Sequence, residues 1–268
     1  MLLSYEFFRH ALLGAMLAAI LCSMIGTYVV CRRNVIVGGG MAHASLGGVG
    51  LGAYFGFSPL LGAAVFAIFS GLGIEWLRRH KVREDSAVAL RWTLGMAVGI
   101  LFAYLAPGFM TDLPAFLFGD ILSINSTDLW AIGVLTVLTS LCFVLLFRPI
   151  VSVCFDRDFA LTQGLPVRLI ETLMTLLTAL TIVSCLHLVG IVMVISLLSV
   201  PQLTAALFVH TFRHTIWLSA VFGFAGCCGG LWLSYLFKVP CGATIICVSV
   251  GIYYLCRIIK AVLSRFIK

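Results

Sequence analysis

Residues 8–31 read FRHALLGAMLAAILCSMIGTYVVC, and Arg32 and Arg33 follow at once. No charged residue lies between Ala11 and Cys31, and a helix of that length can cross the roughly 30 Å of hydrocarbon in a bilayer. Glu6 stands before the stretch in place of a basic n-region, and no cleavage site of small residues precedes the arginine pair. The stretch is therefore predicted to be a retained transmembrane helix and not a signal peptide.

Similar apolar stretches recur along the whole chain, which is 62% hydrophobic and 10% charged with a mean hydropathy of +1.16. Nine segments are predicted to cross the membrane: 8–31, 40–57, 59–77, 87–106, 129–147, 169–187, 190–208, 215–237 and 241–262. Eight spans are the alternative, with one segment re-entrant, because the second is rich in glycine and the sixth and seventh nearly touch at Gly190.

The predicted fold is therefore all-α, a polytopic integral membrane bundle of eight or nine transmembrane helices. The longest polar interruptions, 107–128 and 148–168, are too short to bury a core of their own. Residues 1–268 are accordingly expected to form one transmembrane domain.

The basic residues lie almost entirely on one side of this arrangement. Fifteen of the seventeen occupy that side, namely Arg32, Arg33, Arg78, Arg79, Lys81, Arg83, Arg91, Arg148, Arg157, Arg168, Arg213, Arg257, Lys260, Arg265 and Lys268. Only Arg9 and Lys238 fall on the other. The positive-inside rule then predicts an N-terminus outside and a C-terminus inside the cell, and the net charge of +7 does not require nucleic-acid binding.

Several function classes lack their motifs in this chain. There is no G-x-x-x-x-G-K-[ST] loop for ATP phosphates, and no H-E-x-x-H or G-x-S-x-G motif for a hydrolase. No acidic residue falls near the middle of a predicted span, where ion-driven carriers usually keep one. None of the ten cysteines forms a C-x-x-C pair, so most are expected to pack as small apolar side chains within helices.

The polar connection after the fifth segment contains FDRDFALTQGLPV at residues 155–167. Asp156 suits the N-cap of a short helix that ends at Gly164. Such an amphipathic element outside the membrane could press into a groove on a soluble partner. An ordinary capped surface helix is the alternative.

Five segments, taken in order, resemble the motifs of one transporter family. They are GGGMAHAS at 38–45, FGDIL at 118–122 with STDL at 126–129, the 155–165 connection, VGIVM at 189–193 leading to PQLTA at 201–205, and PCGAT at 240–244. Together they resemble the permease subunit of the ABC importers for zinc, manganese and related divalent metals, the ABC-3 family. The resemblance runs through nearly the whole chain.

The resemblance implies a permease of a prokaryotic inner membrane that moves Zn²⁺ or Mn²⁺ into the cytoplasm and performs no covalent chemistry itself. It also implies a homodimeric pathway, a separate ATPase subunit that binds ATP, and an extracytoplasmic metal-binding protein. Residues expected to couple to the ATPase are Phe155, Asp156, Asp158, Ala160, Gly164 and Leu165. Residues expected at the pathway or its gates are Gly39, Gly119, Gly190, Pro201, Pro240 and Gly242.

The chain departs from the family pattern in two places. The family's aspartate, four residues before the histidine, is Gly39 here, and the P-A-A-T-A motif is altered at Gln202 and Leu203. Both departures leave the identity of the metal open.

His43 is the first candidate metal contact, since it lies among glycines and a neutral imidazole suits zinc. A lone histidine also gives the weak, transient site that transport requires, although a histidine bonded to a neighbouring helix is the alternative. His187 could contact an entering ion or be merely interfacial. Asp112 and Asp120 could attract a hydrated cation at the outer entrance, or simply cap turns, with Gly119 permitting the turn.

Small residues four apart are predicted to mark tight helix contacts, at Gly48/Gly52, Gly52/Gly56, Gly95/Gly99 and Gly226/Gly230.

Two other functions stay open from the residues. A siderophore or cobalamin importer permease shares the coupling and P-x-G blocks but lacks the G-x-x-x-x-H-A segment. A motor-independent channel or scaffold would need no ATPase. An enzyme has no candidate nucleophile or paired acid in this chain.

Overall fold

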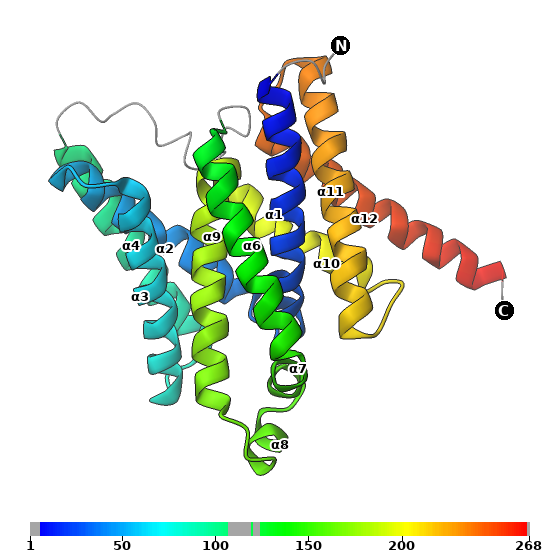
Figure 1. Ribbon diagram of the computed structural model, residues 1–268, viewed down its shortest axis with the longest axis horizontal. Helices are drawn as coiled ribbons and strands as arrows, with labels where there is room; N and C mark the ends of the chain where they lie inside the picture. The colour runs from blue at the N-terminus through cyan, green and yellow to red at the C-terminus, as the bar shows by residue number, and fades with distance from the viewer. Residues whose placement is uncertain (1–5, 107–118, 120–123, 267–268) are drawn as a thin grey trace.

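The computed structural model describes residues 6–106, 119 and 124–266, and every regular element in those residues is an α-helix (Figure 1). In chain order these are α1 (Glu6–Cys31), α2 (Val35–Phe55), α3 (Pro59–Arg79), α4 (Glu84–Leu105), α6 (Ser126–Leu145), α7 (Phe147–Phe155), α8 (Arg157–Thr162), α9 (Val167–Leu197), α10 (Val200–Ala205), α11 (Phe212–Phe237) and α12 (Cys241–Phe266). The predicted all-α helix bundle is confirmed.

Within the described ranges, eight helices are long and apolar enough to cross a membrane. They are α1, α2, α3, α4, α6, the first part of α9 (Val167–Leu186), α11 and α12. The glycine-rich second segment is a continuous helix, so it is not re-entrant.

Of the predicted eight or nine spans, the described residues contain eight, and the seventh predicted segment is the one that is not a full span. The apolar stretch Val189–Ala205 is shorter than a span, and it is broken by non-helical backbone at Gly190 and again between α9 and α10. The broken stretch still carries the chain back through the bundle, because α11 begins near the lower end and runs to the upper end (Figure 1).

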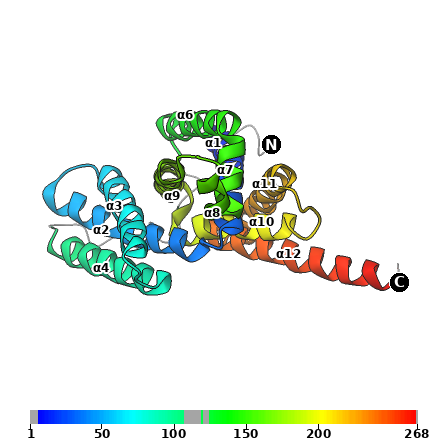
Figure 2. The same ribbon diagram turned by 90° about the horizontal axis from the view of Figure 1, so that it is seen from below.

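The helices form three groups, with α2, α3 and α4 on one side, α1, α6 and α9 in the centre, and α10, α11 and α12 on the other side (Figures 1 and 2). Glycines set the spacing in the first group. A Cβ added at Gly48 would lie 1.9 Å from the Gly62 carbonyl oxygen, and one added at Gly99 would lie 2.4 Å from the Leu46 carbonyl oxygen. These backbones therefore touch directly, which gives van der Waals contact without a hydrophobic driving force from lipid.

The predicted tight contacts are confirmed at most of the glycine pairs. Gly95 meets Ala44, while Gly226 and Gly230 meet Ser249 and Ile245 of α12. The prediction is wrong for Gly56, whose Cβ would meet nothing within 4 Å. Gly56 instead ends α2 with left-handed backbone at φ 75°.

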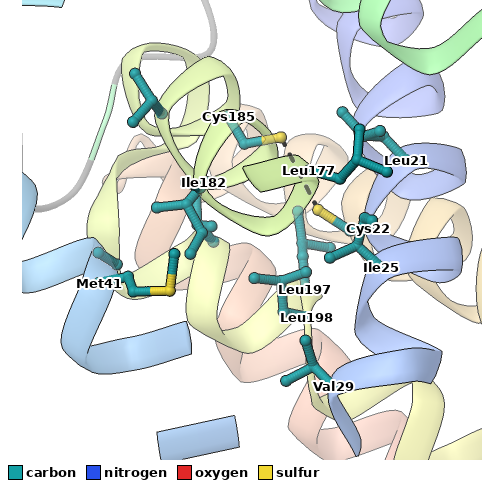
Figure 3. Packing of buried hydrophobic residues seen from close by; sticks show 14 of the residues in the cluster. Leu21, Cys22, Ile25, Val29, Met41, Leu177, Ile182, Cys185, Leu197 and Leu198 are labelled. Carbon is teal, nitrogen blue, oxygen red and sulfur yellow. Dashed lines mark hydrogen bonds between the residues drawn. The ribbon is translucent and has the colours of Figure 1, made fainter. Parts of the chain in front are cut away.

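The central core lies between α1 and α9 (Figure 3). Leu21 and Ile25 from α1 are buried there with Ile182 from α9. The Sγ atoms of Cys22 and Cys185 lie 3.9 Å apart without a disulfide, and all ten cysteines are free. Cys22, Cys185 and Cys227 are fully buried, in agreement with their predicted role as small apolar side chains.

We expect Gly48→Val to destabilise the protein by about 3 kcal/mol, because the added side chain would overlap backbone atoms that cannot move aside. The measurement is the thermal unfolding midpoint in detergent. Gly251→Val is the matched control, since a Cβ at Gly251 meets nothing within 4 Å. Equal midpoints for the two variants would show that the α2–α3 contact is looser than described.

Candidate functional site

The connection expected to couple to a partner forms α7 and α8. Asp156 caps α8, because its Oδ1 accepts hydrogen bonds from the backbone N–H of Asp158 (3.1 Å) and Phe159 (2.9 Å). The helix ends at Thr162, and Gly164 follows with φ 72°. The predicted capped helix is confirmed, and its last helical residue lies two positions before Gly164.

Large apolar side chains are exposed on this connection, at the lower end of the bundle (Figure 1). Phe155 is 65% exposed, Phe159 53% and Leu161 48%, while Ala160 is fully buried. Leu165 packs partly against the core, and its backbone N–H donates to the Ala160 carbonyl at 3.2 Å. The connection is thus anchored on one side and presents an apolar surface outside the spanning helices on the other.

A buried carboxylate ties this connection to three spanning helices. Oε1 of Glu171, on α9, accepts from Nη2 of Arg32 at 2.9 Å and Nη2 of Arg78 at 3.5 Å, and from Nε of Arg157 at 3.2 Å. The side chain of Glu171 is only 3% exposed. These arginines follow α1, belong to the last turn of α3, and begin α8, so four elements meet at one oxygen atom.

The guanidinium of Arg32 stays protonated in this cluster. Burial by itself lowers the pKa of its guanidinium, but the Tyr28 hydroxyl and the Glu171 carboxylate together raise that pKa above the ordinary value. The cluster of Glu171 with Arg32, Arg78 and Arg157 was not predicted as a site. The sequence analysis used the three arginines only as markers of one membrane side, and no local motif in the sequence links them to Glu171.

Two predicted pathway glycines are brought together by the kink in α9. Gly190 has φ 75° and ψ 164°, a conformation essentially restricted to glycine. A Cβ at Gly119 would lie 2.2 Å from the carbonyl carbon of Val189 and 2.3 Å from the nitrogen of Gly190. Gly119 itself has φ 66°, as expected for a turn.

The altered P-A-A-T-A segment forms α10 just beyond this kink. Pro201 is buried in the first turn of α10. The Nε2 of Gln202 donates to the carbonyl oxygens of Cys22 (2.8 Å) and Leu197 (3.1 Å). Its Oε1 is buried and has no hydrogen-bond partner among the described residues. The amide thus links α1 to the end of α9.

The P-x-G block lies at the turn between α11 and α12. Pro240 immediately precedes α12, and its carbonyl accepts from Oγ1 of Thr244 at 2.8 Å. Gly242 is buried in the first turn of α12.

His43 lies on α2, and its ring stacks on Trp92 of α4, with centroids 4.5 Å apart and planes within 8°. Its Nδ1 is buried without a hydrogen-bond partner in the part of the chain described here. A Cβ at Gly39, one turn earlier, would make ordinary contact with Ile195 at 3.7 Å. The expected alternative, a bond from His43 to a neighbouring helix, is therefore not seen at Nδ1.

The other predicted metal contacts are Asp112, Asp120 and His187. Asp112 and Asp120 lie outside the described residues, as does the side chain of His187, whose backbone belongs to α9. Across residues 6–106, 119 and 124–266, no three His, Cys, Asp or Glu side chains are grouped to hold a metal ion. A tight multi-ligand site is therefore absent from the described part of this chain.

The family of the chain follows from comparison with known proteins. The sequence profile of the ABC 3 transport family matches residues 4–260. The chain belongs to this family. The resemblance inferred from the five motifs is thereby confirmed, and with its eight apolar helices the chain is a multi-pass inner-membrane protein.

Relatives in the ABC 3 transport family cover nearly the whole chain. An uncharacterized membrane protein of Synechocystis sp., slr2045, is 38% identical over 92% of this chain and 88% of its own. The manganese transport system membrane protein MntC of Halalkalibacterium halodurans is 32% identical over 95% of this chain and 87% of its own. The structure of PsaBC from Streptococcus pneumoniae in complex with Fab matches with a TM-score of 0.86 at 26% identity, covering 95% of this chain and 92% of that one.

We expect Glu171→Gln to lower the free energy of unfolding by about 2–3 kcal/mol, because three arginines lose the charge that compensates them. Thermal unfolding in detergent measures this change. Glu6→Gln is the control, since the Glu6 side chain is 83% exposed and pairs with Arg9 at the surface. Should both variants unfold at the wild-type temperature, the cluster contributes nothing to stability.

Proposed function

We propose that this chain is the membrane permease subunit of an ATP-driven importer that carries a divalent transition-metal ion, Zn²⁺ or Mn²⁺, into the cytoplasm. Its family membership and the manganese transport function named for its relative MntC support this proposal. The whole chain acts as one transport domain, and ATP hydrolysis takes place on a separate subunit. An extracytoplasmic protein delivers the ion.

The exposed apolar surface of Phe155, Phe159 and Leu161 is the observation that carries the proposal. It lies on α7 and α8, which are not among the candidate membrane spans. A groove on a cytoplasmic ATPase would bury these side chains, and the cluster at Glu171 would pass the movement of α8 to α1, α3 and α9.

The orientation follows if α8 contacts a cytoplasmic ATPase. The start of α1 lies at the end of the bundle opposite α8 (Figure 1), so the N-terminus is outside. From the upper end of the bundle, α12 runs back toward the α8 side, so the C-terminus is inside. This assignment agrees with the basic residues counted along the sequence.

The ion pathway is proposed to lie beside His43, where a second copy of the chain completes it. Trp92, which covers one face of the His43 ring, is 37% exposed on α4. An ion held by His43 alone would lie near the lipid-facing surface. That position is costly, because one imidazole replaces only a small part of the ion's hydration shell. A homodimer would place further ligands opposite and keep the site weak enough to release the ion.

Reconstitution in sealed vesicles tests the function. With its ATPase and binding protein, the chain should accumulate Zn²⁺ or Mn²⁺ against a gradient only when ATP is present. Accumulation without ATP or partners would contradict the proposal. Passive conduction by the chain alone would favour a channel, and uptake of a metal chelate but not the free ion would favour a siderophore or cobalamin importer.

Phe159→Ala should weaken ATPase binding about tenfold, because a half-exposed phenyl ring no longer fills the partner's groove. Co-purification and ATPase stimulation measure the effect. Phe69→Ala, which removes a 67% exposed ring from α3 within the membrane span, is the control and should bind normally. Wild-type ATPase association by the Phe159 variant would remove α8 from the coupling surface.

Gly39→Asp should restore the family's carboxylate one turn before His43 and raise Mn²⁺ uptake several-fold relative to Zn²⁺, since carboxylate oxygens suit manganese. The substitution is sterically tolerable, because the nearest atom to its Cβ is the Ile195 side chain at 3.7 Å. Gly251→Asp, at an exposed position in α12, controls for added charge. An unchanged ratio of Mn²⁺ to Zn²⁺ uptake would place the selective site elsewhere.

A further inference from the structure

A hollow of about 510 Å³ lies beside α8, lined by Arg32, Arg78, Arg79, Arg157, Arg168 and Glu171. We call it the arginine hollow. Its residues come from the ends of α1, α3, α8 and α9, which lie close together in both views (Figures 1 and 2). It is therefore at the membrane surface on the side of the coupling helix.

The positive charge in the arginine hollow exceeds the negative charge that faces it. Three arginines share the single Oε1 of Glu171, and Arg79 pairs with Glu75. Arg168 has no ion-pair partner within residues 6–106, 119 and 124–266. Each guanidinium carries five N–H donors, so most donors remain for an anion, and an anion would relieve the repulsion among the arginines.

A second hollow of about 420 Å³ shares Arg79 and Arg168 with the first and continues along α9. Its remaining lining is Leu169, Thr172, Leu173 and Leu176, which recur on one face of the helix at spacings of three and four. This part of α9 belongs to the membrane span Val167–Leu186. The second hollow, which we call the leucine groove, therefore leads from the charged surface into the hydrocarbon region.

We propose that the arginine hollow and the leucine groove together bind one anionic phospholipid. Its phosphate accepts hydrogen bonds from the arginines, and an acyl chain lies along the leucine groove. A free phosphate ion has the same head chemistry but leaves the groove unused. Phosphatidylcholine carries a cationic choline group. It would therefore bind more weakly at a site that already has excess positive charge.

The proposed lipid would bridge α3, α8 and α9, independently of which ion the protein carries. Because Arg157 belongs to α8 and also reaches Glu171, the bound lipid would restrict the coupling helix. Membrane composition would thereby influence how firmly α8 is held.

Native mass spectrometry of the full chain, purified in detergent and stripped of lipid, tests the site. We expect one dioleoylphosphatidylglycerol to bind about tenfold more tightly than dioleoylphosphatidylcholine. Inorganic phosphate at the same concentration should not displace it. Equal binding of the two lipids would overturn the proposal, and displacement by phosphate would identify a free-anion site instead.

Variants assign the bound lipid to these residues. Arg157→Gln with Arg168→Gln should weaken phosphatidylglycerol binding about tenfold, while Arg32 and Arg78 still hold Glu171. Arg213→Gln with Arg257→Gln removes the same charge from exposed positions on α11 and α12 and should bind as the wild type does. Leu173→Trp should fill the leucine groove and weaken lipid binding without changing the retention of inorganic phosphate.

Measurements on the variants also test whether something other than a lipid occupies the arginine hollow. If the arginine pair leaves lipid binding unchanged, or if its control pair weakens binding equally, the lipid site is refuted. Loss of ATPase association in the arginine variant, together with no phosphatidylglycerol binding by the wild type, would assign the hollow to an acidic surface of the ATPase. The comparison of lipids on the wild type stands even if a variant fails to fold.

Discussion

The bundle depends on one buried carboxylate shared among arginines from separate parts of the chain. Arginines from the ends of α1 and α3 and from the start of α8 all form ion pairs with Glu171, and each contact reaches the same oxygen. A buried charge is costly unless opposite charges compensate it, so the ends of these helices cannot separate freely. The arrangement makes α8 part of the bundle and not a loose loop beneath it.

The glycine contacts add a second constraint of a different kind. Where Gly48 meets Gly62 and Gly50 meets Gly99, backbone lies on backbone, and α2, α3 and α4 are held by close packing with no room for a methyl group. The charged cluster resists separation at one end, whereas the glycine contacts fix the spacing along the helices. A rocking motion of this group would therefore be expected to move its three helices together.

Much of the fold could be predicted from the sequence because apolar length is a direct physical requirement of the bilayer. The segment after Gly190 was misjudged for a clear reason. Its composition is apolar, but a backbone conformation essentially restricted to glycine separates it from the helix before it, and a second break between α9 and α10 divides it. Hydropathy depends on composition alone, so it carries no information about the backbone angles φ and ψ that break the helix.

The site was less predictable than the fold. Asp156 and Gly164 could be placed because capping is local in sequence, whereas the meeting of Arg32, Arg78 and Glu171 depends on tertiary packing. The stacking of His43 on Trp92 is likewise a contact between two helices that no motif contains.

Gln202 lies where the break between α9 and α10 leaves backbone hydrogen bonds incomplete. The end of α9 leaves the Leu197 carbonyl without a following turn, and the Gln202 amide supplies the missing donor. In doing so the side chain leaves its own oxygen buried without a hydrogen-bond donor among the residues that the structure describes. The unsatisfied acceptor has thus moved from the main chain to the side chain, and because a buried acceptor without a donor is costly, the break in the helix lowers the stability of the interior at Gln202.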